Sequence, residues 1–411
     1  SSFNRRRWDL DVFGGSVDFA PMPSAAHPPE HAGRRRPRIL HVYKDYDPPV
    51  MGGIEGTINR MARGLLHAFD VSVLVCRGPC RPGEEMVDGV RVVRVAEWTR
   101  LLSAPVSPAF PAALRREAAR ADILHFHHPN PTGDVAYLLT RPAAPVVMTY
   151  HSDVVRQRFA MVLYGPVQER IMRACRVIMP TSPDYMESSP WLRRHRDRCR
   201  VVPLGIEISR FEPSPAVMER AAAIRGRYDG PIVVFVGRLR YYKGLEFLVR
   251  AMADVAAHAV IIGTGPDGER LRSIAREAGT ADRVHFVGDL PDDEVVHHLH
   301  AADVFCMPSH LRAEALGLSM IEAMACGLPV VSADIPSGVR FVNEDGVTGL
   351  RVAPASPAAL AAALNRLLGD PGLRRRLGEG ARARARALFS ADAMCRNLET
   401  VYRSVLGAAT G

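Results

Sequence analysis

Short apolar runs alternate with amphipathic segments through most of the chain. RILHVY at 38–43 has the composition of a β-strand, and the segment IEGTINRMARGLLHAF that begins at Ile54 repeats apolar residues with the i, i+3, i+4, i+7 spacing of a helix. Further strand candidates in this half are VSVLVC, DILHFH, PVVMTYH, VIMPTS and RVVPLG. Strands that alternate with helices predict a parallel sheet that is covered on both faces.

The same alternation restarts after a hinge-like link at 204–215. The strand candidates of the second series are PIVVFVGRL, AVIIGTG, RVHFVG, DVFCMPS and PVVSAD, with amphipathic helices between them. The pattern predicts an α/β chain of two Rossmann-like, doubly wound parallel-sheet domains, 38–205 and 206–389, which face one interdomain cleft. A last helix, 390–411, with Ser390 as its N-cap, is expected to join the first domain. Since ligands collect at the carboxyl ends of strands in such sheets, the chemistry is expected there.

The first part of the chain has a different texture. Residues 1–37 mix Arg, Pro, Gly and Ala without apolar periodicity and are expected to form a disordered basic tail. No run approaches the roughly 18 consecutive apolar residues of a membrane span, and the first residues lack the apolar stretch of a signal peptide. The expected location is therefore the cytoplasm, with peripheral contact at the inner face of the plasma membrane left open.

Charge is distributed unevenly. The chain carries 53 Lys and Arg against 44 Asp and Glu, a formal net charge of +9. Residues 206–411 are balanced, whereas 38–205 hold 23 basic and 16 acidic side chains. A basic half predicts an anionic partner such as a membrane surface or a phosphorylated acceptor, with the arginines at 115, 116 and 120 or within 193–200 as contacts. Nucleic acid is not expected, because aromatic residues are not interleaved with the arginines.

No metal or other cofactor is expected. The seven cysteines are scattered without a CxxC pair and are interpreted as reduced. The histidine-rich stretches HFHH at 125–128 and HHLH at 297–300 are interpreted as a strand end and an amphipathic helix rather than metal sites. Asp9 and Asp11 spell DxD, but they lie in the expected tail.

Gly52 and Gly53 stand between a strand and the first turn of a helix. Glycines let the backbone approach a ligand closely, and a helix start offers free N–H groups that suit phosphate. Tight packing of the strand on the helix is the alternative explanation of this pair.

A second turn, VGRLRYYKG, contains Gly237 and places Arg238 and Lys243 at the carboxyl end of a strand. A guanidinium and an ammonium at this point can clamp a diphosphate without a metal. Only Lys44 and Lys243 are lysines among the 53 basic residues, which favours a specific role for Lys243. Ordinary solvation of a helix start is the alternative.

The most specific run is AEALGLSMIEAMACG. Glu314 precedes the expected helix start and can face a ligand together with the N–H groups of Leu316, Gly317 and Leu318. Glu322 comes a little over one turn later and can accept hydrogen bonds from vicinal hydroxyls, as a ribose presents them. Carboxylates beside a phosphate-binding helix start need hydroxyl-rich neighbours, and the combination of hydroxyls with phosphate describes a nucleotide sugar.

Together, GGIE, GRLxxxKG, IGTGP and EALGLSMIE resemble glycosyltransferase family 4, retaining enzymes of the GT-B fold, from residue 38 to residue 406. The roles that the resemblance implies are diphosphate binding by Arg238 and Lys243, contact with the donor hexose by Glu314, ribose binding by Glu322 and contact with the phosphates or the acceptor by Gly53. His151 in TYHSD resembles the family histidine that contacts the donor sugar near its reacting face. A structural hydrogen bond is the alternative for this histidine.

The predicted sites therefore fall into two sets. The catalytic set is Arg238, Lys243, Glu314 and His151, and the donor-binding set is Gly52, Gly53, Gly237, Leu316, Gly317, Leu318 and Glu322. The resemblance implies that 38–205 bind the acceptor and 206–389 the nucleotide sugar.

The motifs look most like those of mannosyl- and rhamnosyltransferases of surface-polysaccharide or glycolipid assembly. This implies GDP-mannose as the leading donor, with a UDP-sugar as the second choice, and a hydroxyl acceptor that includes lipid-linked forms. Two alternatives stay open: a glycosyltransferase for a small molecule, of the glycosyl or inositol phosphate type, and a non-catalytic module that binds nucleotide sugar.

Overall fold

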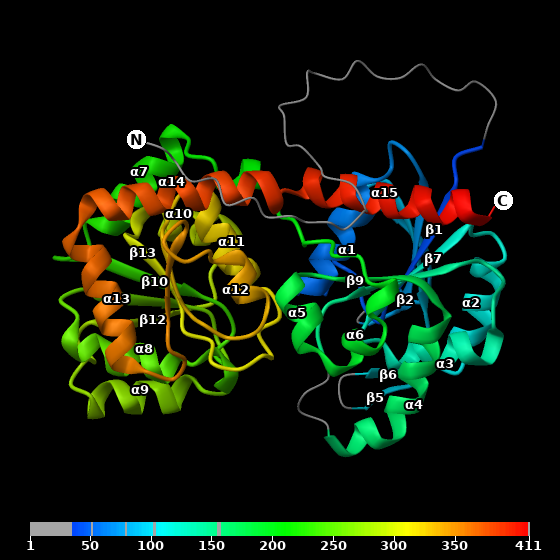
Figure 1. Ribbon diagram of the computed structural model, residues 1–411, viewed down its shortest axis with the longest axis horizontal. Coiled ribbons are helices and arrows are strands. Elements are labelled where there is room, and N and C mark those ends of the chain that lie inside the picture. The colour runs from blue at the N-terminus through cyan, green and yellow to red at the C-terminus, as the bar shows by residue number, and fades with distance from the viewer. Residues whose placement is uncertain (1–34, 51, 79, 102–103, 154–157, 410–411) are drawn as a thin grey trace.

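The computed structural model describes residues 35–409 except 51, 79, 102–103 and 154–157. Most of the expected tail, residues 1–34, therefore lies outside the described residues, as do Asp9 and Asp11. The chain forms two α/β lobes that lie side by side (Figure 1). The helix Pro371–Leu388 lies along one lobe, and the last helix, Ala391–Ala409, lies along the other. No helix in the described part of the chain is both long enough and apolar enough to cross a membrane.

Among the described residues of the N-terminal lobe, seven strands form one sheet in the order β3-β4-β2-β1-β7-β8-β9. Neighbouring strands are parallel except β3 and β4, which form an antiparallel pair at one edge. The order reverses between β1 and β7, as in a doubly wound sheet. The strands are β1 Arg38–Val42, β2 Asp70–Cys76, β3 Gly83–Val87, β4 Val90–Val95, β7 Ile123–His128, β8 Val146–Tyr150 and β9 Cys175–Pro180, and outside this sheet β5 Thr99–Leu101 pairs with β6 Ala104–Val106.

Helices cover both faces of this sheet. They are α1 Gly53–Gly64, α2 Phe110–Ala118, α3 Pro131–Thr140, α4 Arg158–Ala174, α5 Pro183–Ser188 and α6 Pro190–Arg194. All residues of β7 and β8 are buried, because a central parallel strand has a helix layer on either side.

The C-terminal lobe holds a six-stranded, wholly parallel sheet in the order β12-β11-β10-β13-β14-β15 within the described residues. This order is doubly wound and reverses between β10 and β13. The strands are β10 Ile232–Val236, β11 His258–Ile262, β12 Val284–Gly288, β13 Val304–Met307, β14 Val330–Ala333 and β15 Gly349–Val352. The helices are α7 Pro215–Arg225, α8 Leu245–Ala251, α9 Gly268–Glu277, α10 Asp292–Ala301, α11 Leu318–Ala325, α12 Gly338–Val342, α13 Pro357–Gly369 and α14 Pro371–Leu388.

The chain crosses between the lobes at two adjacent points. Ile206 and Ser390 form an isolated bridge, in which Ile206 N–H donates to Phe389 O and Ala391 N–H donates to Ile206 O, both at 2.8 Å. A Cβ atom at Gly205 would strike the backbone of Ser390, so the close approach of the two crossings requires glycine there.

The helix α15, Ala391–Ala409, begins directly after the second crossing. Ala393 N–H donates to Ser390 Oγ at 3.2 Å, which confirms Ser390 as its N-cap. The helix then packs on α1 and β9 of the N-terminal lobe.

Two local predictions are wrong. Residues 200–205 do not form a strand of the sheet. Arg200 and Val202 donate backbone hydrogen bonds to Ile178 and Pro180 of β9, but the chain then leaves β9 for the lobe crossing, where Ile206 N–H donates to Phe389 O. The β3–β4 and β5–β6 pairs were not expected; β3 and β5 are exposed and lack a buried apolar face, whereas β4 is buried and was missed.

Candidate active site

Two buried side chains of opposite charge meet at the carboxyl edge of the C-terminal sheet, near the reversal point of its strand order. Lys243 Nζ lies 2.6 Å from Glu314 Oε2, and the two residues are 9% and 8% exposed. Ser309 Oγ donates to the same carboxylate oxygen at 3.1 Å. Burial alone lowers the pKa of Lys243, but Glu314 and Tyr242 more than compensate and raise it above its ordinary value. The ammonium therefore stays charged at neutral pH.

Glycines let the surrounding turns close on this ammonium. Lys243 ends the short helix η3, Tyr241–Lys243, and Gly244 follows it with φ +65°. A Cβ atom at Gly244 would strike the carbonyl of Pro308, which follows β13. Gly237, at φ +148°, lies beside the lysine, because a Cβ built there would be 3.6 Å from Lys243 Nζ.

The start of α11 presents unbonded N–H groups. Its N-cap is Gly317 at φ +81°, which offers no side chain to cap the helix. In the described chain, the N–H groups of Leu316, Gly317 and Leu318 donate no backbone hydrogen bond, while the Leu316 side chain is buried in the core of its lobe. Free donors at the positive end of a helix dipole form an anion-binding site.

Glu322 lies in the second turn of α11 and is half-buried. Within the described residues its carboxylate has no ion pair. Burial raises the pKa of Glu322 above its ordinary value, and the charge of Arg60 opposes part of this shift. The carboxylate is thus available to a ligand with hydroxyl groups.

Arg60 was not singled out from the sequence. It lies on α1, and its Nε donates to Gly205 O at the lobe crossing at 3.1 Å, while its Nη2 donates to Thr57 Oγ1 at 3.0 Å. The guanidinium of one lobe is therefore held within electrostatic reach of Glu322 on the other. The sequence signal is only a polar position on an amphipathic helix, which does not reveal what it faces.

The starts of α1 and α11 face one another across the lobes. A Cβ built at Gly53 would lie 3.5 Å from Leu318 Cδ1. Gly52 is the N-cap of α1 and, like Gly317, provides no side-chain cap. The Glu55 side chain folds back over Gly52, and burial raises the pKa of this carboxyl group. No role had been assigned to Glu55 from the motif GGIE.

His151 directly follows β8, and its N–H donates to His128 O at 3.1 Å. Two residues later, Asp153 forms an ion pair with Arg312 of the other lobe at 2.7 Å. Ala315 packs against the core cluster of the N-terminal lobe that contains Tyr150. The loop that carries Glu314 therefore lies against the segment that carries His151.

Arg238 differs from the other predicted residues. It follows β10 as expected, but its side chain is exposed and forms no ion pair within the described ranges. The structure thus joins Lys243, Glu314 and Gly237 in one cluster and pairs Gly53 with Leu318. Among the described residues, the Arg238 side chain has no hydrogen bond or ion pair with either group.

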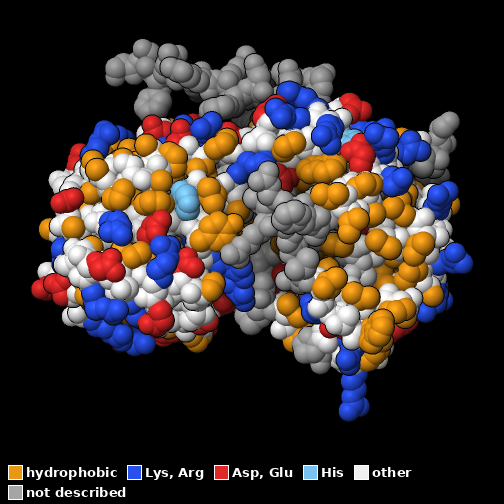
Figure 2. All heavy atoms as spheres, turned by 90° about the horizontal axis from the view of Figure 1, so that it is seen from below, with side chains coloured by type: hydrophobic (Ala, Val, Ile, Leu, Met, Phe, Trp, Pro, Cys, Tyr) orange, Lys and Arg blue, Asp and Glu red, His pale blue; other side chains and the backbone are white. Residues whose placement is uncertain are grey.

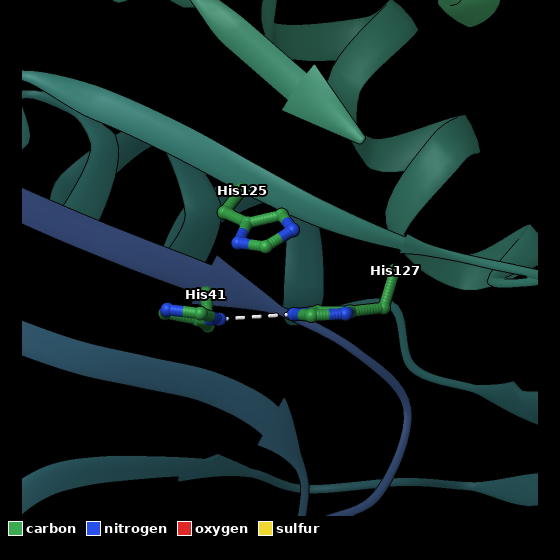
Figure 3. Close-up of side chains that lie close together, drawn as sticks. All are labelled: His41, His125 and His127. Carbon is green, nitrogen blue, oxygen red and sulfur yellow. Dashed lines mark hydrogen bonds between the residues drawn. The ribbon is translucent and has the colours of Figure 1, made fainter. Parts of the chain in front are cut away.

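A cluster of three buried histidines lies in the N-terminal lobe. Ring nitrogens of His41 on β1 and of His125 and His127 on β7 lie within 4.8 Å of one another (Figure 3). The expectation that HFHH is a strand end holds only for His128, since His125 and His127 lie inside β7. All six ring nitrogens of the cluster already have hydrogen-bond partners, namely each other, Tyr402, Thr149 and His151. The three histidines are therefore part of a hydrogen-bonded chain, and a metal ion would have to replace these bonds.

Two doubly wound lobes, linked by a double crossing and meeting at two uncapped helix starts, define the GT-B class of glycosyltransferases. Residues 51–210 match the family described as Glycosyltransferase Family 4, and residues 219–384 match Glycosyl transferases group 1. The chain belongs to glycosyltransferase family 4 and is a hexosyltransferase, as the motifs predicted.

Individual relatives agree with this assignment. The chain is 35% identical to the D-rhamnosyltransferase WbpZ of Pseudomonas aeruginosa, over 86% of this chain and 92% of that protein. It is 33% identical to the O-antigen chain mannosyltransferase C of Escherichia coli, over 90% of this chain and 99% of that protein. The structure is similar to that of sucrose-phosphate synthase from Thermosynechococcus elongatus, with a TM-score of 0.77 and 26% identity over 91% of this chain and 100% of that one. The predicted GT-B fold is confirmed.

Proposed function

We propose that this chain is a retaining glycosyltransferase that moves a hexose, with mannose as the leading candidate, from a nucleoside diphosphate to a hydroxyl acceptor in cell-surface polysaccharide or glycolipid assembly. The observation that carries the proposal is the Lys243–Glu314 pair beside the unbonded N–H groups of α11. A cation with free N–H groups suits a diphosphate, and a carboxylate suits sugar hydroxyls. The names of the rhamnosyl- and mannosyltransferase relatives support the choice of sugar and pathway.

The donor then lies mainly on the C-terminal lobe. Its diphosphate binds at the start of α11 with Lys243 and Arg238, and Glu322 accepts hydrogen bonds from the ribose hydroxyls. Glu314 Oε2 is engaged by Lys243, so its Oε1 is assigned to the hexose hydroxyls. Because these cations supply the positive charge, no metal is required in this scheme.

Catalysis comes from stabilisation of the leaving group. The bond between the anomeric carbon and the phosphate oxygen breaks, and Lys243 and the helix N–H groups stabilise the negative charge on that oxygen. The acceptor hydroxyl, held by the N-terminal lobe, attacks from the same face, and its proton passes to the leaving phosphate oxygen. Closure of the lobes about the crossing at Gly205 and Ser390 brings the reactants together.

The proposal includes contact between the N-terminal lobe and an anionic lipid surface. Exposed large apolar side chains gather on the adjoining elements β5, β6, α3 and α4 and directly before β5: Trp98, Leu101, Val106, Val135, Leu139, Val162 and Leu163. Figure 2 shows apolar side chains spread over this lobe. The lobe also carries the excess of basic side chains, and Arg141 and Arg170 are exposed at the end of α3 and on α4. Exposed apolar side chains next to arginines can bind an anionic membrane, because the apolar groups enter the headgroup layer and the arginines contact its negative charges.

Ligand-dependent melting and product analysis test the proposal. GDP is expected to raise the melting temperature more than UDP or ADP, because a ligand stabilises the state that binds it. Incubation with GDP-mannose and a glycan acceptor should give a product with the anomeric configuration of the donor. An inverted product, or a melting temperature that no nucleotide changes, would contradict the proposal. Transfer to inositol phosphate but not to glycans would favour a small-molecule enzyme instead.

A further inference from the structure

An unbroken chain of hydrogen bonds crosses the interior of the N-terminal lobe and ends at the candidate sugar-binding histidine. In order it runs through His151, His127, His41, Tyr402, His125 and Thr149. The successive donor–acceptor distances are 3.1, 2.9, 3.5, 2.6 and 2.7 Å. None of its members is more than 4% exposed. Three strands and the last helix contribute to the chain, so it forms only in the folded lobe.

The imidazoles of the chain are neutral at pH 7. Burial lowers the pKa of His41 and His151 to about 3, and burial with mutual repulsion lowers the pKa of His125 and His127 well below the ordinary value. A neutral imidazole has one N–H donor and one acceptor nitrogen. Each ring must therefore accept from one neighbour and donate to the next, which couples all of the tautomers.

Tyr402 joins the two halves of the chain. Its hydroxyl lies 2.6 Å from His125 Nδ1 and 3.5 Å from His41 Nε2, and it carries a single proton. If it accepted from both rings, its buried proton would have no partner among the described residues, so it accepts from one ring and donates to the other. The proton order therefore continues through the hydroxyl, and only two directions exist for the whole chain.

The end groups decide between these directions. If Thr149 donates to His125, the protons point toward His151, whose Nε2 accepts from His127 and whose Nδ1 carries the proton. In the reverse direction, both the Thr149 hydroxyl proton and the Nδ1 lone pair of His151 lack partners among the described residues. An unsatisfied buried polar group destabilises the fold, so the first direction, with one unsatisfied group, is favoured.

We propose that His127, His41 and Tyr402 are positioning residues that hold His151 as the neutral tautomer protonated on Nδ1, a hydrogen-bond donor to a hydroxyl oxygen of the sugar donor. The buried Nδ1 atom has no partner in the part of the chain that the structure describes. The identity of the sugar ligand rests on the proposed function, whereas the tautomer depends only on this lobe.

Nitrogen NMR of the enzyme labelled with ¹⁵N-histidine tests the tautomer directly. At pH 7, long-range ¹H–¹⁵N correlations should show His151 protonated on Nδ1 and bare on Nε2, with signals assigned by their loss in His151→Gln. In Tyr402→Phe the ring that packs edge-on against Phe69 remains and only the linking hydroxyl is lost, so His151 should become a mixture of tautomers. A native His151 protonated on Nε2, or an unchanged tautomer in Tyr402→Phe, would overturn the proposal.

Activity gives a second readout. Tyr402→Phe should lower kcat about 10-fold, the lower end of the effect seen when partners behind a functional histidine are removed. Tyr46→Phe is the matched control, since Tyr46 is a buried tyrosine of the same lobe whose hydroxyl has no partner within the described residues. The Tyr46→Phe variant should keep the native tautomer of His151 and the native kcat. An enzyme that transfers no sugar would defeat the proposed function, and the NMR result would still decide the tautomer.

Discussion

Lys243 Nζ and Glu314 Oε2 lie 2.6 Å apart, on two different turns at the carboxyl edge of the C-terminal sheet. Both residues are buried, so the charge of each is compensated chiefly by the other. Removal of one partner leaves an unpaired buried charge, which costs far more than the pair contributes when intact. Effects on stability and on catalysis must therefore be separated in any test of this site.

Substitution of Lys243 and Glu314, singly and together, provides that separation. Lys243→Met should lower kcat/KM by about 10²- to 10³-fold, as expected when a group that stabilises the leaving oxygen is lost. It should also lower the free energy of unfolding by about 3 kcal/mol. The double variant with Glu314→Gln should regain most of this stability in urea unfolding but no activity. Near-native turnover in either single variant would refute the assigned roles.

Glu322→Ala should weaken nucleotide binding. If the carboxylate accepts hydrogen bonds from a ribose, its loss should reduce the affinity for GDP about 10-fold, the equivalent of 1.4 kcal/mol. Isothermal calorimetry measures the affinity directly. Glu269→Ala is the control, because Glu269 lies in the same lobe with a side chain that is 89% exposed. Equal affinities in the two variants would remove Glu322 from the nucleotide site.

The buried histidines should make the N-terminal lobe sensitive to acid. Burial lowers the pKa of His41, His128 and His151 to about 3, so below pH 6.5 the unfolded chain binds protons that the folded chain does not. The free energy of unfolding that the neutral histidines contribute is fully present above about pH 6.5 and is lost as the pH falls toward 3. The loss is about 1.4 kcal/mol per pH unit for each proton that the unfolded chain binds in excess of the folded chain. Burial raises the pKa of Asp134 to about 7, so between about pH 4 and pH 7 the folded chain holds a proton there that the unfolded chain lacks. This offsets the effect of the histidines by up to one proton.

Urea unfolding between pH 7 and pH 5, followed by tryptophan fluorescence, measures this slope. Trp98 and Trp191 both lie in the N-terminal lobe and report on it. His128→Phe should reduce the slope by about one proton, because the ring still stacks on Tyr150 but no longer titrates. An identical slope in His128→Phe would contradict the pKa assignment.

The exposed apolar side chains on and next to β5, β6, α3 and α4 should determine how strongly the protein binds a membrane. Val162→Ser together with Leu163→Ser removes two of the most exposed of these side chains and should reduce co-flotation with anionic vesicles several-fold, since binding scales with buried apolar area. Met218→Ser on α7 of the other lobe removes an apolar side chain that is 45% exposed and should have no effect. If the native enzyme does not float with vesicles at low salt, the lipid contact is wrong.

The sequence determined the two doubly wound lobes and the residues at their strand ends. Periodicity and composition are local properties, so strands such as PIVVFVGRL and the helix that carries Glu322 could be recognised without their neighbours. The β3–β4 pair was missed and residues 200–205 were wrongly predicted to be a strand, because strand pairing depends on neighbouring segments.

Only the tertiary structure decided which of these groups meet. It pairs Lys243 with Glu314, leaves Arg238 exposed and places Arg60 at the lobe crossing. It also links His151 to Tyr402 on the last helix, through His127 and His41. The physical reason is that hydrogen bonds and ion pairs form over a few ångströms between segments far apart in the chain. Their partners are set by the way that the lobes and α15 pack, which no local pattern of residues encodes.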